Sequence, residues 1–183
     1  MADHGTTEER EILTWQGFGD ASRALSQAIV DSGWTPDLIV AIARGGMIPG
    51  GALAYAMGIK VMGAMNVEFY TGIGETLPEP QLLPPLMSID DLEGKKVLVV
   101  DDVADSGKTL DMVMRLIRTH GLALGGDTIM NVDARSATIY TKSRSVITPD
   151  YFWKKTDRWI NFPWSTLPVV VPADSNATPR DAA

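Results

Sequence analysis

The chain contains no cysteine, no long hydrophobic run and no excess of basic charge. Without cysteine it forms neither a disulfide nor a thiolate metal site, which fits the cytoplasmic protein that we expect. No apolar stretch approaches the roughly 18 residues of a membrane-spanning helix, so we expect no membrane span. The net charge of −7 is opposite in sign to that of a typical nucleic-acid-binding protein, so we expect neither DNA nor RNA as a partner.

What the chain does contain indicates one globular domain. Its 183 residues are 45% hydrophobic, which is enough to bury a substantial core. The first residues are polar and lack the pattern of a signal peptide, and the residues after Pro172 are small and polar. We therefore expect a domain over residues 12–171, with flexible tails at 1–11 and 172–183.

Residues 97–110 predict a strand, a short loop and a helix. The run 97–100 is apolar and β-branched, typical of a buried parallel strand, and it ends in two acids, Asp101 and Asp102. A loop of residues 103–108 follows. The predicted helix after it has one apolar face, formed by Leu110, Val113, Met114, Leu116 and Ile117.

A connection of this kind can bind a phosphorylated ligand. Backbone N–H groups of the loop and of the helix N-terminus present partial positive charge to an anion. Ser106 and Thr109 add hydroxyl donors, and Gly107 allows a close approach of the backbone. Asp101 and Asp102 suit sugar hydroxyls and Mg²⁺ instead. The combination predicts a ligand that carries phosphate, ribose hydroxyls and a metal ion together.

Two other motifs with similar residues do not fit. A Walker A loop requires glycine at the position of Asp102, where a carboxylate would repel a triphosphate. A receiver domain also has a strand that ends in paired acids, but it would begin at this strand and place its phosphoacceptor after a later one. The residues after Lys142 do not resemble the second half of such a domain.

A second strand, turn and helix are predicted earlier in the chain. Residues 37–43 form a buried apolar run, and a helix of small residues follows through Met57. Between them stand Arg44, which supplies a positive charge, and Gly45 and Gly46, which expose backbone N–H groups. The residues alone leave two possibilities open, an ordinary turn or a second anion-binding loop.

The other predicted elements continue the alternation of helices and strands. Residues 18–32 predict an amphipathic helix with Asp20 as N-cap and Gly33 after its end. Its apolar stripe holds Ala21, Leu25, Ala28 and Ile29. Further strands are expected at 59–65, 128–132 and 134–141, the last of which leads to Lys142. The stretch 66–94, rich in proline and glycine, predicts a long loop that is functional or mobile.

Both turns resemble motifs of the type I phosphoribosyltransferases. Residues 97–110 are similar to the family's signature for phosphoribosyl pyrophosphate (PRPP): four apolar residues, two acids, then an acid, Ser or Thr, Gly, any residue and Thr. Residues 44–50, Arg-Gly-Gly-x-x-Pro-Gly, are similar to its pyrophosphate loop. The resemblance implies an α/β fold with a mostly parallel sheet flanked by helices, and a small C-terminal hood at about 143–171.

The aromatic residues 151–164 resemble those of bacterial xanthine–guanine phosphoribosyltransferases. There a strand ends in Lys and is followed by Tyr and then Trp-Ile-acid-x-Pro-Trp. The resemblance implies that Lys142 contacts O6 of a 6-oxopurine, that Trp159 stacks on its ring, and that the Ile160 backbone meets its 2-position. Asn161 stands where those enzymes carry an acid. From composition alone, the aromatic cluster can also be a small hydrophobic lid.

The same resemblance implies transfer of the phosphoribosyl group from PRPP to a purine base in purine salvage, with Mg²⁺ as cofactor. Asp105 would be the catalytic residue, accepting a proton or hydrogen bond from purine N7; as a local interpretation it can also stabilise the turn. Asp102 and Asp101 would hold the metal and the ribose. Relatives assemble as homodimers or homotetramers. The PRPP-binding residues would be Arg44, Gly45, Gly46, Asp101, Asp102, Ala104, Asp105, Ser106, Gly107, Lys108 and Thr109.

Two alternatives remain open. In the family, the long loop closes over the site, and relatives commonly contact pyrophosphate with a basic residue from it, yet residues 61–94 contain no Lys or Arg. This absence and Asn161 are compatible with a regulator that binds PRPP or nucleotides without turnover. A phosphoribosyltransferase for another acceptor base is the second alternative.

Overall fold

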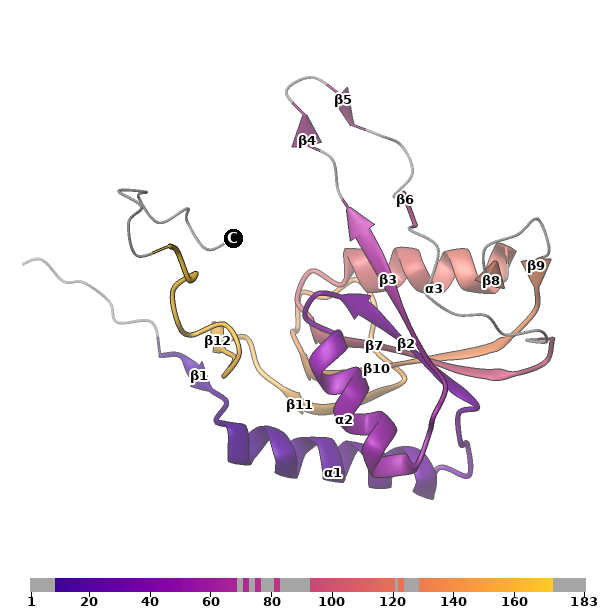
Figure 1. Ribbon diagram of the computed structural model, residues 1–183, viewed down its shortest axis with the longest axis horizontal. Coiled ribbons are helices and arrows are strands. Elements are labelled where there is room, and N and C mark those ends of the chain that lie inside the picture. Colours follow the sequence, from indigo (N-terminus) through magenta and orange to yellow (C-terminus); the bar gives the residue numbers. More distant parts are fainter. Residues whose placement is uncertain are drawn as a thin grey trace, which may run out of the picture. The chain divides into compact units, whose positions relative to one another are not determined.

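The computed structural model describes residues 9–68, 71–72, 75–76, 81–82, 93–120, 122–123 and 129–172 (Figure 1). The chain divides into two compact units, Gly19–Asp157 and a second one composed of Met1–Phe18 and Arg158–Ala183. In the part of the chain that the structure describes, no helix has the length and apolar character needed to cross a membrane.

The unit of residues 19–157 is built on one six-stranded sheet. Its strand order is β11-β10-β7-β2-β3-β6, and all neighbours are parallel except β3 and β6. The mostly parallel α/β sheet predicted from the sequence is thus confirmed. The strands are β2 (Leu38–Ala43), β3 (Met62–Glu68), β6 (Gln81–Leu82), β7 (Lys96–Ala104), β10 (Asp133–Thr141) and β11 (Tyr151–Lys155).

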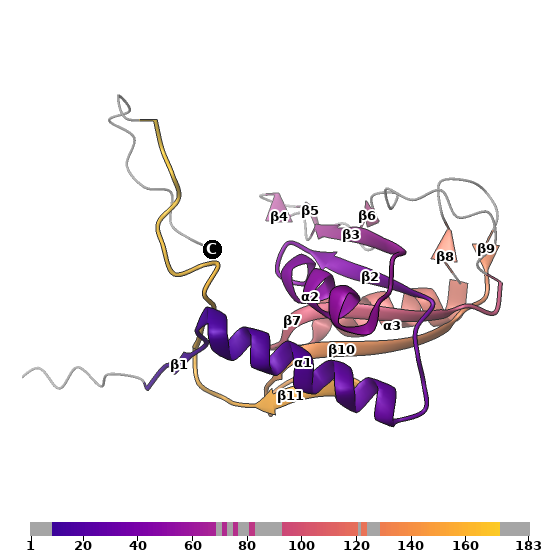
Figure 2. The same cartoon turned by 60° about the horizontal axis from the view of Figure 1, so that its bottom comes forward.

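Helices cover both faces of this sheet (Figure 2). Helix α2 (Met47–Met57) packs on one face, where Gly50 lies against Ile39 and Ala41. Helix α3 (Lys108–His120) packs on the other face, because its apolar residues cluster with alternate residues of β2 and β7. That cluster includes Leu38, Val40, Val97, Val99, Leu110, Val113, Met114 and Ile117. Burial on both faces explains why β2 and β7 are continuous apolar runs rather than alternating ones.

Helix α1 (Trp15–Asp31) begins earlier than the sequence predicted. The expected N-cap, Asp20, is wrong, because Thr14 performs this role and its Oγ1 accepts the Gly17 N–H at 3.0 Å. The predicted stripe is confirmed at Ala21, Leu25 and Ile29, which are buried. It is wrong at Ala28, which is exposed. Gly33 follows the helix with φ of 74°, as its predicted role requires.

Two strands differ from expectation. Strand β7 continues through Asp101 and Asp102 to Ala104, because it keeps pairing with β10 along this length. The acids therefore lie within the strand, and the loop after it is shorter than predicted. Strand β11 was not expected; it pairs in parallel with β10 and falls within the range 143–171 that the resemblance assigns to the hood.

The predicted long loop is described only in part. Strand β3 begins at Met62, three residues later than predicted, and runs on to Glu68. Within the loop, β4 (Thr71–Gly72) pairs with β5 (Glu75–Thr76). Residues 69–70, 73–74, 77–80 and 83–92 lie outside the described residues. The predicted strand 128–132 corresponds to β9 (Ile129–Met130), which pairs with β8 (Leu122–Ala123).

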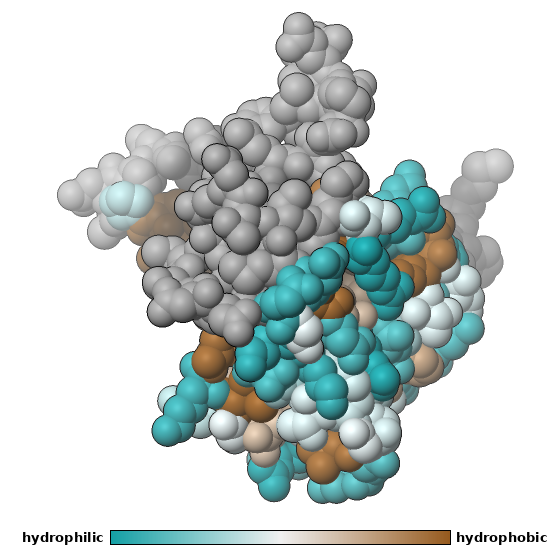
Figure 3. Space-filling model, turned by 90° about the vertical axis from the view of Figure 1, so that its right-hand side faces the viewer, coloured by the Kyte–Doolittle hydropathy of each residue, from teal (hydrophilic) through white to brown (hydrophobic). Residues whose placement is uncertain are grey.

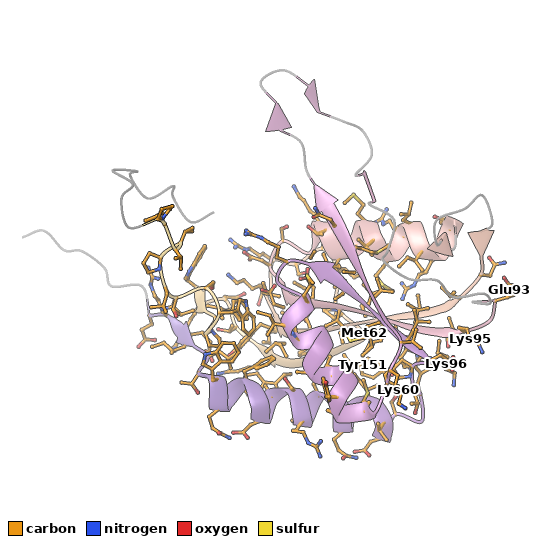
Figure 4. All side chains as sticks on the ribbon, in the orientation of Figure 1. Lys60, Met62, Glu93, Lys95, Lys96 and Tyr151 are labelled. Atoms are coloured by element: carbon orange, nitrogen blue, oxygen red, sulfur yellow. The ribbon has the colours of Figure 1, made fainter. Side chains whose placement is uncertain are left out.

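The side of the sheet at which the parallel strands begin is polar. Lys60 precedes β3, and Lys95 and Lys96 lie at the start of β7 beside Glu93 (Figure 4). The described surface on this side is mostly hydrophilic, with small separate apolar patches (Figure 3). The predicted PRPP-binding residues and Lys142 come from the opposite edge, where the strands end.

The second unit is held together by a short sheet and an aromatic cluster. Strand β1 (Glu11–Ile12) pairs in parallel with β12 (Ile160–Asn161). The ring of Trp164 stacks on Phe162 at 4.8 Å between centroids and meets Phe18 edge-on at 5.3 Å. Part of the aromatic segment therefore forms the small hydrophobic core of this unit.

Candidate active site

Three neighbouring strands bring the predicted PRPP-binding residues and the predicted base-binding residue Lys142 to one edge of the sheet. Strand β2 leads to Arg44, β7 carries Asp101 and Asp102, and β10 leads to Lys142. Parallel strands end at the same edge, and this is where ligands bind in α/β sheets. The ends of β7 and β10 are joined directly, because the Lys142 N–H donates to the carbonyl of Ala104 at 3.1 Å.

The Arg44–Gly46 turn lies directly against the two acids. A Cβ on Gly45 would stand 2.3 Å from Oδ2 of Asp102. A Cβ on Gly46 would stand 2.2 Å from the carbonyl oxygen of Val100. The neighbour of Gly46 is backbone, which excludes any side chain there, whereas a Cβ on Gly45 fits only if the Asp102 carboxylate moves. Glycine at both positions therefore lets the turn approach β7. Arg44 itself is exposed, and the Ala43–Arg44 peptide bond is cis.

Asp101 and Asp102 are partly shielded carboxylates at the floor of this edge. Oδ1 of Asp101 accepts the Asp102 N–H at 2.9 Å. Burial raises the pKa of Asp102 to about 6, although backbone N–H donors oppose the shift. Burial and then the charge of Asp102 raise the pKa of Asp101 well above its ordinary value. The pair therefore gains from a cation, and its oxygen donors fit Mg²⁺.

The loop after β7 has the form of an anion-binding turn. Gly107 has φ of 72°, and helix α3 begins immediately after it at Lys108. The Gly107 carbonyl accepts the Asp111 N–H at 2.8 Å, and Ser106 Oγ accepts the Lys108 N–H at 3.4 Å. Ser106 and Lys108 are exposed, Thr109 is half-buried and Ala104 is buried. Exposed hydroxyl and N–H donors at a helix N-terminus can bind a phosphate group.

A further loop, residues 143–147, packs against the turn after β7, residues 105–107, which we call the phosphate loop. The sequence analysis did not predict this contact. The Val146 N–H donates to the Ser106 carbonyl at 3.0 Å. A Cβ on Gly107 would stand 2.1 Å from Ser145 Oγ, so the two loops are in close contact. On its other side, Ser143 donates to Asp157 through its N–H at 2.7 Å and its hydroxyl at 2.8 Å. These hydrogen bonds lower the pKa of the Asp157 carboxyl.

Asp105, the predicted catalytic residue, contacts two basic side chains. Lys142 Nζ lies 3.3 Å from Asp105 Oδ1, and Lys142 is 7% exposed. Arg144 donates to the same oxygen from Nε at 2.8 Å and also from Nη2. The structure thus brings Asp105 and Lys142 together as a pair. Arg144 was missed, although a Lys-x-Arg sequence at the end of a predicted strand was the available signal.

The remaining predicted base-binding residues belong to the second unit. Trp159 is 59% exposed, whereas Ile160 is buried in β12. The side-chain oxygen of Asn161 accepts a hydrogen bond from Arg10 at 3.2 Å. Arg158 pairs with Glu9, which further ties the two segments of this unit. Trp159 is more exposed than Trp164, whose ring stacks on Phe162.

Comparison with known proteins agrees with this architecture. Residues 9–169 match the model of the phosphoribosyl transferase domain family. The chain is 31% identical over 162 residues to a xanthine-guanine phosphoribosyltransferase of Gluconobacter oxydans, covering 87% of each chain.

Among solved structures, a purine phosphoribosyltransferase from Pyrococcus horikoshii matches with a TM-score of 0.69 and 31% identity, covering 89% of this chain and 99% of that one. A xanthine-guanine-hypoxanthine phosphoribosyltransferase from Helicobacter pylori shares the fold, with a TM-score of 0.71 at 22% identity. It covers 86% of this chain and 95% of that one. The predicted family is confirmed: the chain belongs to the phosphoribosyltransferases, and within them it is similar to the enzymes that act in purine metabolism.

Proposed function

We propose that this protein transfers the 5-phosphoribosyl group of PRPP to N9 of a 6-oxopurine (hypoxanthine, guanine or xanthine) in purine salvage, releasing pyrophosphate. The observation that carries the proposal is the pair formed by Asp105 and the buried Lys142, whose charged atoms are 3.3 Å apart. A 6-oxopurine with a proton on N7 presents a donor and the O6 acceptor along one edge. A carboxylate beside an ammonium group complements that edge.

The same pair disfavours adenine. Adenine carries an amino group where a 6-oxopurine has its carbonyl oxygen, so the Lys142 ammonium would face another donor. A buried donor left without an acceptor costs binding free energy. Recognition of the carbonyl thus selects the 6-oxopurine class, and Trp159, the Ile160 backbone and Asn161 are the groups proposed to contact the ring and its 2-substituent.

The loops that follow the strands would bind the phosphate, ribose and pyrophosphate groups of PRPP. The 5-phosphate would bind the N–H groups of residues 104–109 together with Ser106, Thr109 and Lys108. Asp101 and Asp102 would accept hydrogen bonds from the ribose hydroxyls. Arg44 and the N–H groups of Gly45 and Gly46 would stabilise the charge that develops on the leaving pyrophosphate. Asp102 and Asp101 would also hold Mg²⁺, which supplies further charge neutralisation when bound.

Asp105 would act on the incoming base. Its carboxylate would accept the N7 proton or a hydrogen bond from it, which raises electron density in the imidazole ring and makes N9 a better nucleophile. The bond from N9 to the anomeric carbon then forms as the bond to pyrophosphate breaks. The proton remains with Asp105 until it leaves to solvent.

Two further expectations are part of the proposal. Residues 12–171 would form the functional domain, and the protein would assemble as a homodimer or homotetramer. A subunit neighbour could supply the positive charge that residues 61–94 lack. This lack of Lys and Arg also favours the alternative of a regulator that binds PRPP or nucleotides without turnover. An enzyme for a different acceptor base is the other alternative.

Pyrophosphate release from PRPP and Mg²⁺ with hypoxanthine, guanine, xanthine and adenine tests these alternatives. We expect turnover with one or more 6-oxopurines and none with adenine. Lys142→Ala should lose most of this activity, whereas Lys60→Ala, which removes an exposed lysine at the opposite edge of the sheet, should not. Binding of PRPP without turnover of any base would favour the regulator, and full activity of Lys142→Ala would refute the base assignment.

A further inference from the structure

Arg144 contacts the proposed catalytic residue Asp105, but the proposed reaction gives Arg144 no role. Its guanidinium donates twice to one carboxylate oxygen, Oδ1 of Asp105, from Nε at 2.8 Å and from Nη2. Lys142 approaches the same oxygen at 3.3 Å. Two cations thus share one oxygen, which leaves the carboxylate a second oxygen to direct at a ligand.

The backbone that carries Arg144 is fixed on both sides. Ser143 is bound to the Asp157 carboxylate through two hydrogen bonds, and Val146 is bound to the carbonyl of Ser106 in the phosphate loop. Ser145 closes the turn with hydrogen bonds to Lys142 and Ile147. None of these contacts requires a substrate. Arg144 is therefore presented to Asp105 by a pre-formed loop.

We propose that Arg144 is a positioning residue: it holds the Asp105 carboxylate in the orientation that meets purine N7 while Lys142 turns to O6. The inference rests on the proposed function. When a purine enters, the Lys142 ammonium donates to the carbonyl of the base and holds Asp105 less strongly. Arg144 then remains as the cation beside Asp105, and its two donors prevent rotation of the carboxylate.

A purely structural role fits the geometry poorly. The side chains of Arg144 and Asp105 are 64% and 38% exposed, and exposed ion pairs add little to folding stability. Removing Arg144 should therefore shift the melting temperature by no more than about 3 °C. Misplacement of a reacting group, in contrast, can reduce turnover by about 10- to 100-fold.

The first test is a double-mutant cycle with Arg144→Ala and Asp105→Asn. Because Arg144 acts through Asp105, Arg144→Ala should lower kcat about tenfold or more in the wild type, and by less than about twofold in the Asp105→Asn background. KM values for PRPP and for the base should change by less than about twofold. Arg144→Lys, which keeps the charge and one donor group, should recover part of kcat.

Arg115→Ala is the matched control. Arg115 forms an exposed ion pair with Asp111 on α3, outside the site, so its removal should leave kcat unchanged. An Arg144→Ala variant with wild-type kcat overturns the inference. So does an equal effect in both backgrounds, or a rise confined to the KM for PRPP, since these outcomes indicate a direct contact with PRPP or no role at all.

A measurement without turnover separates this inference from the proposed function. In ¹⁵N NMR spectra of the protein without substrate, the Nε–H of Arg144 should be protected from exchange, and the protection should disappear in Asp105→Asn. Absence of that signal in the wild type overturns the inference even if the enzyme is active. If the wild type binds PRPP but releases no pyrophosphate with any base, the proposed function fails, and a positioning role in catalysis fails with it.

Discussion

Gly45 and Asp102 approach each other so closely that a Cβ on Gly45 would stand 2.3 Å from the carboxylate oxygen Oδ2. The contact joins the turn after β2 to the acids of β7, which lie on neighbouring strands. In the proposed reaction the Gly45 N–H binds the leaving pyrophosphate and Asp102 binds the ribose, which are the two groups joined by the bond that breaks. Their contact therefore couples leaving-group binding to ribose binding, and it sets a strict limit on side-chain size.

Gly45→Ala should impair PRPP use more than folding. The added methyl group can be accommodated only if the Asp102 side chain moves, because its carboxylate provides all three of the closest atoms. We expect the KM for PRPP to rise about tenfold, while the free energy of unfolding changes by less than about 1 kcal/mol. Steady-state kinetics and urea denaturation measure the two effects. A variant with normal KM would show that Asp102 does not contact the ribose or the metal.

Gly46→Ala should instead impair folding. Here the nearest atoms are the backbone carbonyl oxygens of Val100 and Ile42, at 2.2 and 2.7 Å, and a central strand cannot move aside. We expect a loss of about 2–4 kcal/mol in the free energy of unfolding. Gly51→Ala is the matched control, because a Cβ at this position of helix α2 meets no atom within 4 Å. It should be neutral or stabilising by up to about 1 kcal/mol; equal losses in both variants would contradict the argument.

Asp102→Asn should stabilise the protein in a pH-dependent way when Mg²⁺ and PRPP are absent. The Asp102 pKa is about 6 in the folded protein against an ordinary value of 3.8, so the folded state binds its proton more tightly. Ionisation therefore costs stability, a cost that is absent below about pH 4 and complete above about pH 6. The difference corresponds to at most about 3 kcal/mol.

Chemical denaturation in EDTA at several pH values between 4 and 8 measures this effect. The free energy of unfolding of Asp102→Asn relative to the wild type should increase as the pH rises through this window. Asp20→Asn, which removes an exposed acid on α1, controls for the loss of one negative charge. A constant difference between Asp102→Asn and the wild type across the window would show that burial does not raise this pKa.

The apolar runs and the glycines were sufficient to predict the central strands β2 and β7 and the turns that follow them. Strands 37–43 and 97–100 are buried on both faces, so they read as continuous hydrophobic segments. Their ends could be placed less well, because pairing with β10 keeps Asp101 and Asp102 extended although aspartate is uncommon in strands. Tertiary pairing, rather than local preference, decides where β7 ends.

The support of the site could not be predicted in this way. Arg144 and Asp105 are 39 residues apart in the sequence, and Asp157 contacts Ser143 across 14 residues. Such contacts depend on the loop 143–147 lying against the phosphate loop. The hydrophobic periodicity of the sequence carries no information about this contact between two loops. Strand β11 was missed for a related reason: its sequence, Tyr-Phe-Trp-Lys-Lys, combines aromatic and basic residues, and only its pairing with β10 makes it a strand.

Trp159→Ala should weaken binding of the purine base. Stacking of an aromatic side chain on a base contributes about 1–3 kcal/mol, so we expect the KM for the base to rise about 5- to 150-fold while the KM for PRPP stays within about twofold. Trp159→Phe should recover most of the effect, because it keeps a flat ring. Trp15→Ala is the control: Trp15 has the same exposed fraction, 59%, but its ring packs near Phe18 and Trp164. Trp15→Ala should lower the melting temperature and leave the KM for the base unchanged, whereas equal KM values for Trp159→Ala and the wild type would refute stacking on Trp159.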